Sequence, residues 1–189
     1  KLCMTNMTEN KAELSRFYDD NDNFFHVLRD SFRENGDFRP MLIAFGREAM
    51  YTKLPFNSEF DEYDIPGILV ALLQSDNKTE VYVSLFIIAG LAKNSNEYVS
   101  SLVNECVHNS IMKILTIKDN VSKKLVNQLL ALTALKFIAL ESEESRDKLL
   151  ACASLGKIAS TLLLNFKTDD IIQCLYGYIK ALLSYKSIR

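Results

Sequence analysis

Tryptophan is absent from this chain of 189 residues, and glycine (6) and proline (3) are scarce. Glycine and proline are the residues that most often interrupt regular structure, so their scarcity favours helices joined by short polar turns. Strict alternation of apolar and polar residues, which is typical of strands, is almost absent. Residues 81–88 alone have a strand-like composition, and their apolar continuation to Ala92 favours a helix there as well. We therefore expect an all-α protein.

An excess of positive charge is also missing. The chain has 22 Lys and Arg residues against 24 Asp and Glu residues, a net charge of −2. Nucleic-acid-binding domains usually carry a clustered basic excess, so we expect no nucleic-acid partner. No apolar run reaches the ~20 residues that a membrane-spanning helix needs, so we expect no membrane span. The first residues lack the apolar core of a signal peptide. We expect a cytoplasmic protein, with a nuclear location as the alternative and secretion disfavoured.

Patterns that carry chemistry are absent too. The four cysteines form no Cys-x-x-Cys pair; they are Cys3, Cys106, Cys152 and Cys174. The two histidines, His26 and His108, lie far apart in the sequence, and we expect a partly packed His26 and a surface His108. No ligand spacing typical of zinc and no glycine-rich phosphate loop occurs. We therefore expect no catalytic residue, no metal site and no cofactor, and we do not expect an enzyme.

A step of 47 residues connects apolar positions in the second half of the chain. The matched sets are Leu85, Leu132 and Ile179; Ile88, Leu135 and Leu182; Leu91, Ile138 and Tyr185; and Ile68, Leu115 and Leu162. Polar segments at 74–80, 93–97, 118–124 and 141–148 separate the apolar stretches, which argues against one continuous helix. Repeats of this length, each a group of two or three helices, are typical of α-solenoids.

The apolar periodicity predicts the positions of the helices. The expected ranges are 8–19, 24–34, 38–54, 66–73, 80–93, 97–106, 109–115, 123–140, 145–153, 156–165 and 169–185. The order short, medium, long recurs after residue 64. We therefore expect residues 64–189 to form about two and a half repeat units, and residues 1–63 to form an irregular helical cap or a degenerate repeat. The chain does not begin with Met, which suggests part of a larger chain or complex.

Several segments resemble armadillo repeats, within the broader armadillo/HEAT class. Residues 64–73 resemble the second helix of such a repeat. The segment that follows resembles the long third helix at Val81, Ser84, Leu85, Ile88, Leu91 and Ala92. The next segment resembles the first helix of the following repeat at Asn96, Val99, Leu102 and Val103. The resemblance implies a right-handed α-solenoid of three-helix repeats that binds an extended peptide along its third helices. Nuclear-import receptors of this family use a repeated Trp with an Asn four residues later, and this chain has no Trp. Binding of import signals by that arrangement is therefore not expected.

Aromatic, basic and hydroxyl side chains lie on the third helices at positions that point away from the core. They are Tyr82, Phe86 and Lys93, then Thr133, Lys136 and Phe137, then Tyr176 and Lys180. Such side chains suit the anchoring of a peptide or helix, although Phe86, Phe137 and Tyr176 could instead fill gaps in the core. We expect a non-catalytic scaffold or adaptor that binds a protein or peptide partner on this face. Two alternatives are a regulatory factor, either a small-GTPase exchange factor or a chaperone-type armadillo protein, and a fragment of a larger trafficking or assembly protein.

Overall fold

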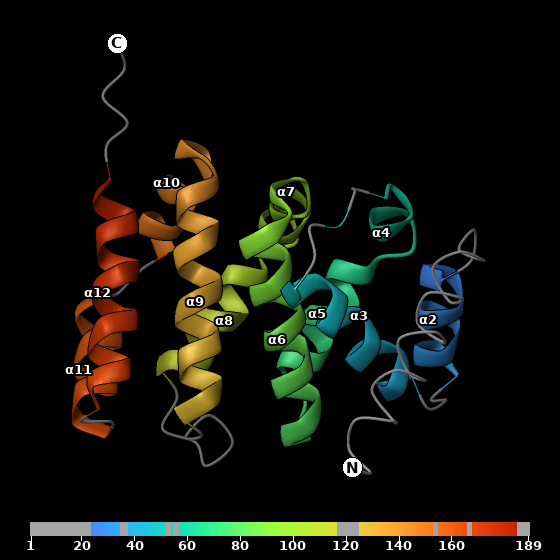
Figure 1. Ribbon diagram of the computed structural model, residues 1–189, viewed down its shortest axis with the longest axis horizontal. Coiled ribbons are helices and arrows are strands. Elements are labelled where there is room, and N and C mark those ends of the chain that lie inside the picture. Colours follow the sequence, from blue (N-terminus) through green and yellow to red (C-terminus); the bar gives the residue numbers. More distant parts are fainter. Residues whose placement is uncertain are drawn as a thin grey trace, which may run out of the picture.

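The computed structural model describes residues 24–34, 38–51, 54, 57–116, 125–152, 155–165 and 168–184. All regular secondary structure in these ranges is helical (Figure 1). The helices are α2 (Phe24–Arg33), α3 (Arg39–Tyr51), α4 (Glu59–Glu62), α5 (Ile65–Leu73), α6 (Lys78–Asn94), α7 (Asn96–Asn104), α8 (Val107–Thr116), α9 (Leu125–Glu141), α10 (Glu143–Cys152), α11 (Leu155–Asn165) and α12 (Asp169–Leu183). The expected helices from residue 24 onward are all present, and α4 is an additional short one. The helix expected at 8–19 lies outside the described residues.

The long helices stand side by side in the order of the sequence (Figure 1). Helix α3 packs against α6, α6 against α9, and α9 against α12. A second layer lies against this row, because α5 packs against α6, α8 against α9, and α11 against α12. The expected all-α solenoid is confirmed.

The 47-residue step holds for the third helices of two successive units. Helix α6 covers residues 78–94 and α9 covers residues 125–141, so both ends differ by 47. Two matched pairs, Leu85 with Leu132 and Ile88 with Leu135, are fully buried. Burial of each such side chain stabilises the fold by roughly 1.5–3 kcal/mol. The matched positions therefore form a continuous core between adjacent units.

The second helices of the same two units follow a shorter step. Helix α5 begins at residue 65 and α8 at residue 107, which is a step of 42. The residue before each helix has a left-handed backbone, with φ 56° at both Asp64 and Cys106. The expected match of Ile68 with Leu115 is therefore wrong, because Leu115 takes the place of Leu73. The additional residues of the longer step fall between α8 and α9, at 117–124, outside the described residues.

The helices before residue 63 join the same two layers. Helix α2 contacts α5, and α3 contacts α6. Phe24, Phe25 and Leu28 are buried on α2 with the spacing that Ile65, Pro66 and Leu69 have on α5. Aromatic rings fill the core here: the Phe25 centroid lies 5.4 Å from that of Phe45 and 5.7 Å from that of Phe60.

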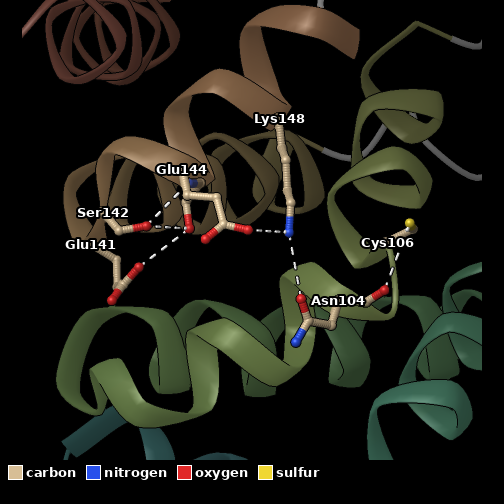
Figure 2. Close-up of polar contacts among 7 residues, drawn as sticks. Asn104, Cys106, Glu141, Ser142, Glu144 and Lys148 are labelled. Atoms are coloured by element: carbon tan, nitrogen blue, oxygen red, sulfur yellow. Dashed lines mark hydrogen bonds and ion pairs between the residues drawn. The ribbon is translucent and has the colours of Figure 1, made fainter.

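Polar contacts fix the start of α10 (Figure 2). The Ser142 hydroxyl accepts a hydrogen bond from the Ser145 backbone N–H at 3.0 Å, which caps the helix. The Lys148 Nζ lies 2.9 Å from Glu144 Oε1 and donates to Asn104 Oδ1 at 3.4 Å. Because Asn104 ends α7, Lys148 connects the first helices of two adjacent units.

Candidate functional site

On one side of the third-helix row, no other helix that the structure describes packs against it. Each of α6, α9 and α12 is packed by a second helix from behind and by neighbouring third helices along the row. We define the ladder face as the exposed and half-buried side chains of α3, α6, α9 and α12 on the side away from α5, α8 and α11. All eight candidate residues from the sequence lie on these helices, and each is exposed or half-buried.

Helix α6 contributes a pair of stacked rings. The centroids of Tyr82 and Phe86 are 6.1 Å apart, with an angle of 18° between the ring planes. Tyr82 is 39% exposed, whereas Phe86 is half-buried. The Phe86 ring lies against α3, since a Cβ added at Gly46 would come within 2.9 Å of Phe86 Cδ1. Lys93 is exposed near the end of the helix.

Helices α3 and α6 approach each other closely beside this pair. A Cβ added at Gly90 would lie 2.7 Å from the backbone carbon of Ala49 and from the nitrogen of Met50. The Asn94 side chain donates from Nδ2 to the carbonyl oxygens of Ala49, at 2.9 Å, and Met50, at 2.8 Å. Glycine thus permits backbone contact, and Asn94 satisfies two carbonyls at the end of α3.

Helix α9 contributes a cation above an aromatic ring. The Lys136 Nζ lies 5.1 Å from the centroid of Phe137, within the range of a cation–π interaction. The aliphatic stem of Lys136 reaches α12, where a Cβ added at Gly177 would meet its Cδ at 3.5 Å. Phe137 is half-buried and packs against the core. The Thr133 hydroxyl donates to the Leu129 carbonyl at 2.7 Å, within its own helix.

Helix α12 is the most open of the third helices. Tyr176 is 67% exposed, and Lys180, one turn later, is also exposed. Leu183 on the same helix is 65% exposed. Cys174 is half-buried, and burial raises the pKa of its thiol. A raised pKa disfavours the reactive thiolate, so Cys174 has the environment of a packing residue.

The structure brings some of the candidate residues into contact and leaves others apart. Tyr82 contacts Phe86, and Lys136 contacts Phe137. Phe86 lies against α3 and Phe137 packs against the core, as the interpretation of these rings as core residues expects, whereas their role in binding stays a prediction. Sequence reasoning missed Ile43 and Arg47, which are exposed on α3. The repeat predicted from the sequence begins at residue 64 and does not include α3, whose place beside α6 is seen only in the packing.

His108 differs from expectation. It was expected at the surface beside a turn, but it lies inside α8 and is only 3% exposed. The reason is the 42-residue step, which gives His108 the buried place that Pro66 has on α5. Burial lowers the pKa of His108, and the nearby Lys148 ammonium adds to that shift.

Other kinds of site receive no support from the described residues. No group of three or more His, Cys, Asp or Glu side chains among them could hold a metal ion. Within the same ranges, every helix is too short or too polar to cross a membrane.

The solved structures that are similar to this chain include two designed proteins. One is a designed armadillo repeat protein in complex with the peptide (KR)4, with a TM-score of 0.64, 18% sequence identity and 84% of this chain covered. The other is a computationally designed armadillo repeat protein for modular peptide recognition, with the same TM-score and identity and 82% of this chain covered. The fold is that of an armadillo-like repeat solenoid.

This chain spans only part of the length of these two proteins, 62% of the first and 63% of the second. No family model and no curated protein sequence matches the chain. The likeness therefore shows the fold, and the eight candidate residues remain a prediction.

Proposed function

We propose that this armadillo-like chain is a non-catalytic scaffold that binds an extended polypeptide segment across the ladder face. One observation carries the proposal: α6, α9 and α12 each present an aromatic ring next to a cation or a second ring on the side that no other described helix covers. Rigid aromatic anchors with polar neighbours are frequent in peptide-binding surfaces. The two similar designed proteins give further support, because one is in complex with a peptide and the other was designed for modular peptide recognition.

The same proposal assigns the chain a protein partner and no catalytic role. Stacked helical repeats generally serve as extended binding surfaces. The net charge of −2 favours a polypeptide over a nucleic acid as the partner. A cytoplasmic location, and membership of a larger complex, fit such a scaffold.

The proposal also includes helices α2 and α3 in the repeat array. They hold the places of a second and a third helix, because α2 contacts α5 and α3 contacts α6. On this view the ladder face begins at α3, with Ile43 and Arg47 as its first exposed residues. Residues 1–63 then contain a degenerate repeat.

Alanine substitution at Tyr82, Tyr176 and Lys180 tests the ladder face. These three side chains are exposed, so their removal should leave the melting temperature within a few degrees of the parent. Phe86 and Phe137 are less suitable, because they also pack between helices. The measurement is quantitative affinity capture from lysate, and we expect bound proteins to be lost from the triple variant.

A matched control removes exposed apolar side chains elsewhere. Leu150 on α10 and Leu164 on α11 are exposed, and neither belongs to a third helix. The Leu150→Ala and Leu164→Ala double variant should capture the same proteins as the parent. If the ladder variant captures an unchanged set while remaining folded, the proposed face is wrong.

A further inference from the structure

We infer that the segment bound on the ladder face is acidic, an inference that rests on the proposed function. Every third helix contributes at least one cation to that face. These cations are Arg47 on α3, Lys93 on α6, Lys136 on α9 and Lys180 on α12. Arg47, Lys93 and Lys180 are exposed, and Lys136 is half-buried above the Phe137 ring.

The four cations are available for a partner. None of them forms an ion pair with any residue that the structure describes. Arg39, which also lies on α3, differs from them because its guanidinium is 3.7 Å from Glu80 Oε1. The ladder face therefore presents positive charges that no described carboxylate balances.

Acidic side chains on the same helices lie near the helix ends or already have partners. Glu80, near the start of α6, accepts hydrogen bonds from Ser75 and Asn77 as well as pairing with Arg39. Glu141 ends α9 and accepts from Ser145 at 3.2 Å. The remaining acids are Glu48 on α3, which is half-buried with an interaction of its own, and Asp169 and Asp170, which begin α12. Carboxylates at a helix start are stabilised by the helix dipole.

Charge is therefore segregated in this chain. The whole molecule has a net charge of −2, yet the middle of the ladder face is positive. Complementary charge across an interface favours the correct partner and suppresses the wrong one. Aromatic surface next to Lys136 and Lys180 removes water around an arriving carboxylate, which strengthens its attraction to the ammonium groups.

Helix packing also sets the spacing that the acids need. Packed helices lie 8–10 Å apart, so cations on successive third helices are separated by roughly 10 Å or slightly more. An extended peptide advances about 3.3 Å per residue. Acidic residues about three to four positions apart, with apolar residues between them, would match the face.

Selection from a library of random twelve-residue peptides displayed on phage tests the inference. The full 189-residue chain is compared with the charge-reversed variant K93E/K136E/K180E. We expect the parent to enrich peptides that have Asp or Glu at three- to four-residue intervals. The affinity of the best acidic peptide, measured by fluorescence polarisation, should fall at least about tenfold in the variant and should weaken with added salt.

Two further variants control for charge and for stability. R33E/K113E/K157E makes the same change of charge on α2, α8 and α11, at exposed positions outside the ladder face, and should alter the affinity by less than about twofold. K93E/K180E spares Lys136, whose stem packs near Gly177, and keeps the test valid if the triple variant is unstable.

Each other result overturns the inference in a distinct way. If the selection instead enriches neutral or basic peptides whose binding requires Tyr82 and Tyr176, the inference of an acidic partner is wrong and the proposed function stands. No enriched peptide at all would contradict both. If acidic peptides bind the K93E/K180E variant with the same affinity as the parent, their binding site lies elsewhere on the protein. Tighter binding of single-stranded DNA than of any peptide, lost in the charge-reversed variant, would indicate a nucleic-acid partner instead.

Discussion

The junction between α3 and α6 differs from the junction between α9 and α12. At the first junction, Gly46 lets the Phe86 ring approach α3, and Gly90 lets the backbone of α3 approach α6. A Cβ added at either glycine would lie 2.7–3.0 Å from the nearest of these neighbouring atoms. In the second, the stem of Lys136 lies over Gly177 at ordinary contact distances of 3.5 Å or more. Polar groups also cross the first junction, since Asn94 donates to two carbonyls of α3. The buried Ser95 hydroxyl likewise exchanges hydrogen bonds with the backbone of Leu54.

The difference shows that helices in equivalent places can be joined by different means. Phe137 stands on α9 where the 47-residue step places Gly90 on α6. Because Gly90 meets the preceding third helix, α3, a ring at the equivalent place on α9 bears on the junction between α6 and α9, where it cannot allow the backbone contact that glycine allows. The junction between α3 and α6 depends on small residues and satisfied carbonyls, whereas at the junction between α9 and α12 the long side chain of Lys136 lies over Gly177.

Substitution of the glycines should give the largest difference in stability between the two junctions. Gly90→Ala places a methyl group 2.7 Å from backbone atoms of Ala49 and Met50, which cannot move without displacing α3. We expect a loss of about 2–4 kcal/mol in the free energy of unfolding, measured by urea denaturation.

Gly177→Ala is the matched control for this change. Its new methyl group would meet only the Lys136 stem, and alanine favours a helix over glycine by roughly 0.5–1 kcal/mol. We expect unchanged or slightly increased stability. Equal effects of the two substitutions would show that the junctions do not differ in the way described.

Removal of the Asn94 amide should have the next largest effect. Asn94→Ala leaves the carbonyls of Ala49 and Met50 without this donor, and we expect a loss of about 1–2 kcal/mol in thermal or urea unfolding. Asn165→Ala is the control, because the exposed Asn165 amide donates to the Thr161 carbonyl within its own helix, at 2.8 Å. A loss as large in the control would contradict a special role for the contact between α3 and α6.

His108 should produce a smaller, pH-dependent effect. Its pKa is lowered by burial in the native state, whereas the unfolded chain takes up a proton near the ordinary value of ~6.5. The unfolded state thus binds more protons at low pH, so native stability should fall as the pH decreases below about 6.5.

His108→Leu removes this titration. We expect the variant to lose less stability than the parent between pH 7.5 and 5.5, by about 1 kcal/mol or less, in urea unfolding at several pH values. Parallel curves for parent and variant would show that His108 does not titrate differently in the two states.

Much of the helical architecture follows from the sequence alone. The apolar spacing in residues 64–189 predicted each third helix to within a few residues, because the third helices contain long periodic stretches. Short elements gave less signal: α4 has four residues and one buried ring, Phe60, which is too little for a periodic pattern. The 42-residue step of the second helices was hidden, because Ile68 and Leu115 are both apolar and so fit the wrong step equally well.

The candidate face was predictable in part. Sequence periodicity placed Tyr82, Tyr176 and Lys180 on the outer sides of their helices, and they are exposed there. It could not show that Phe86 lies against Gly46 of α3 or that the Lys136 stem reaches Gly177 of α12, because such contacts depend on how closely two helices approach.

The sequence by itself determined that the chain is helical and repetitive, since hydrophobic periodicity is a local property of neighbouring residues. Tertiary structure alone decided that His108 is buried, that α3 packs beside α6, and that the Lys136 stem reaches α12. These features depend on distances between segments some 40 or more residues apart, and no local pattern encodes such distances.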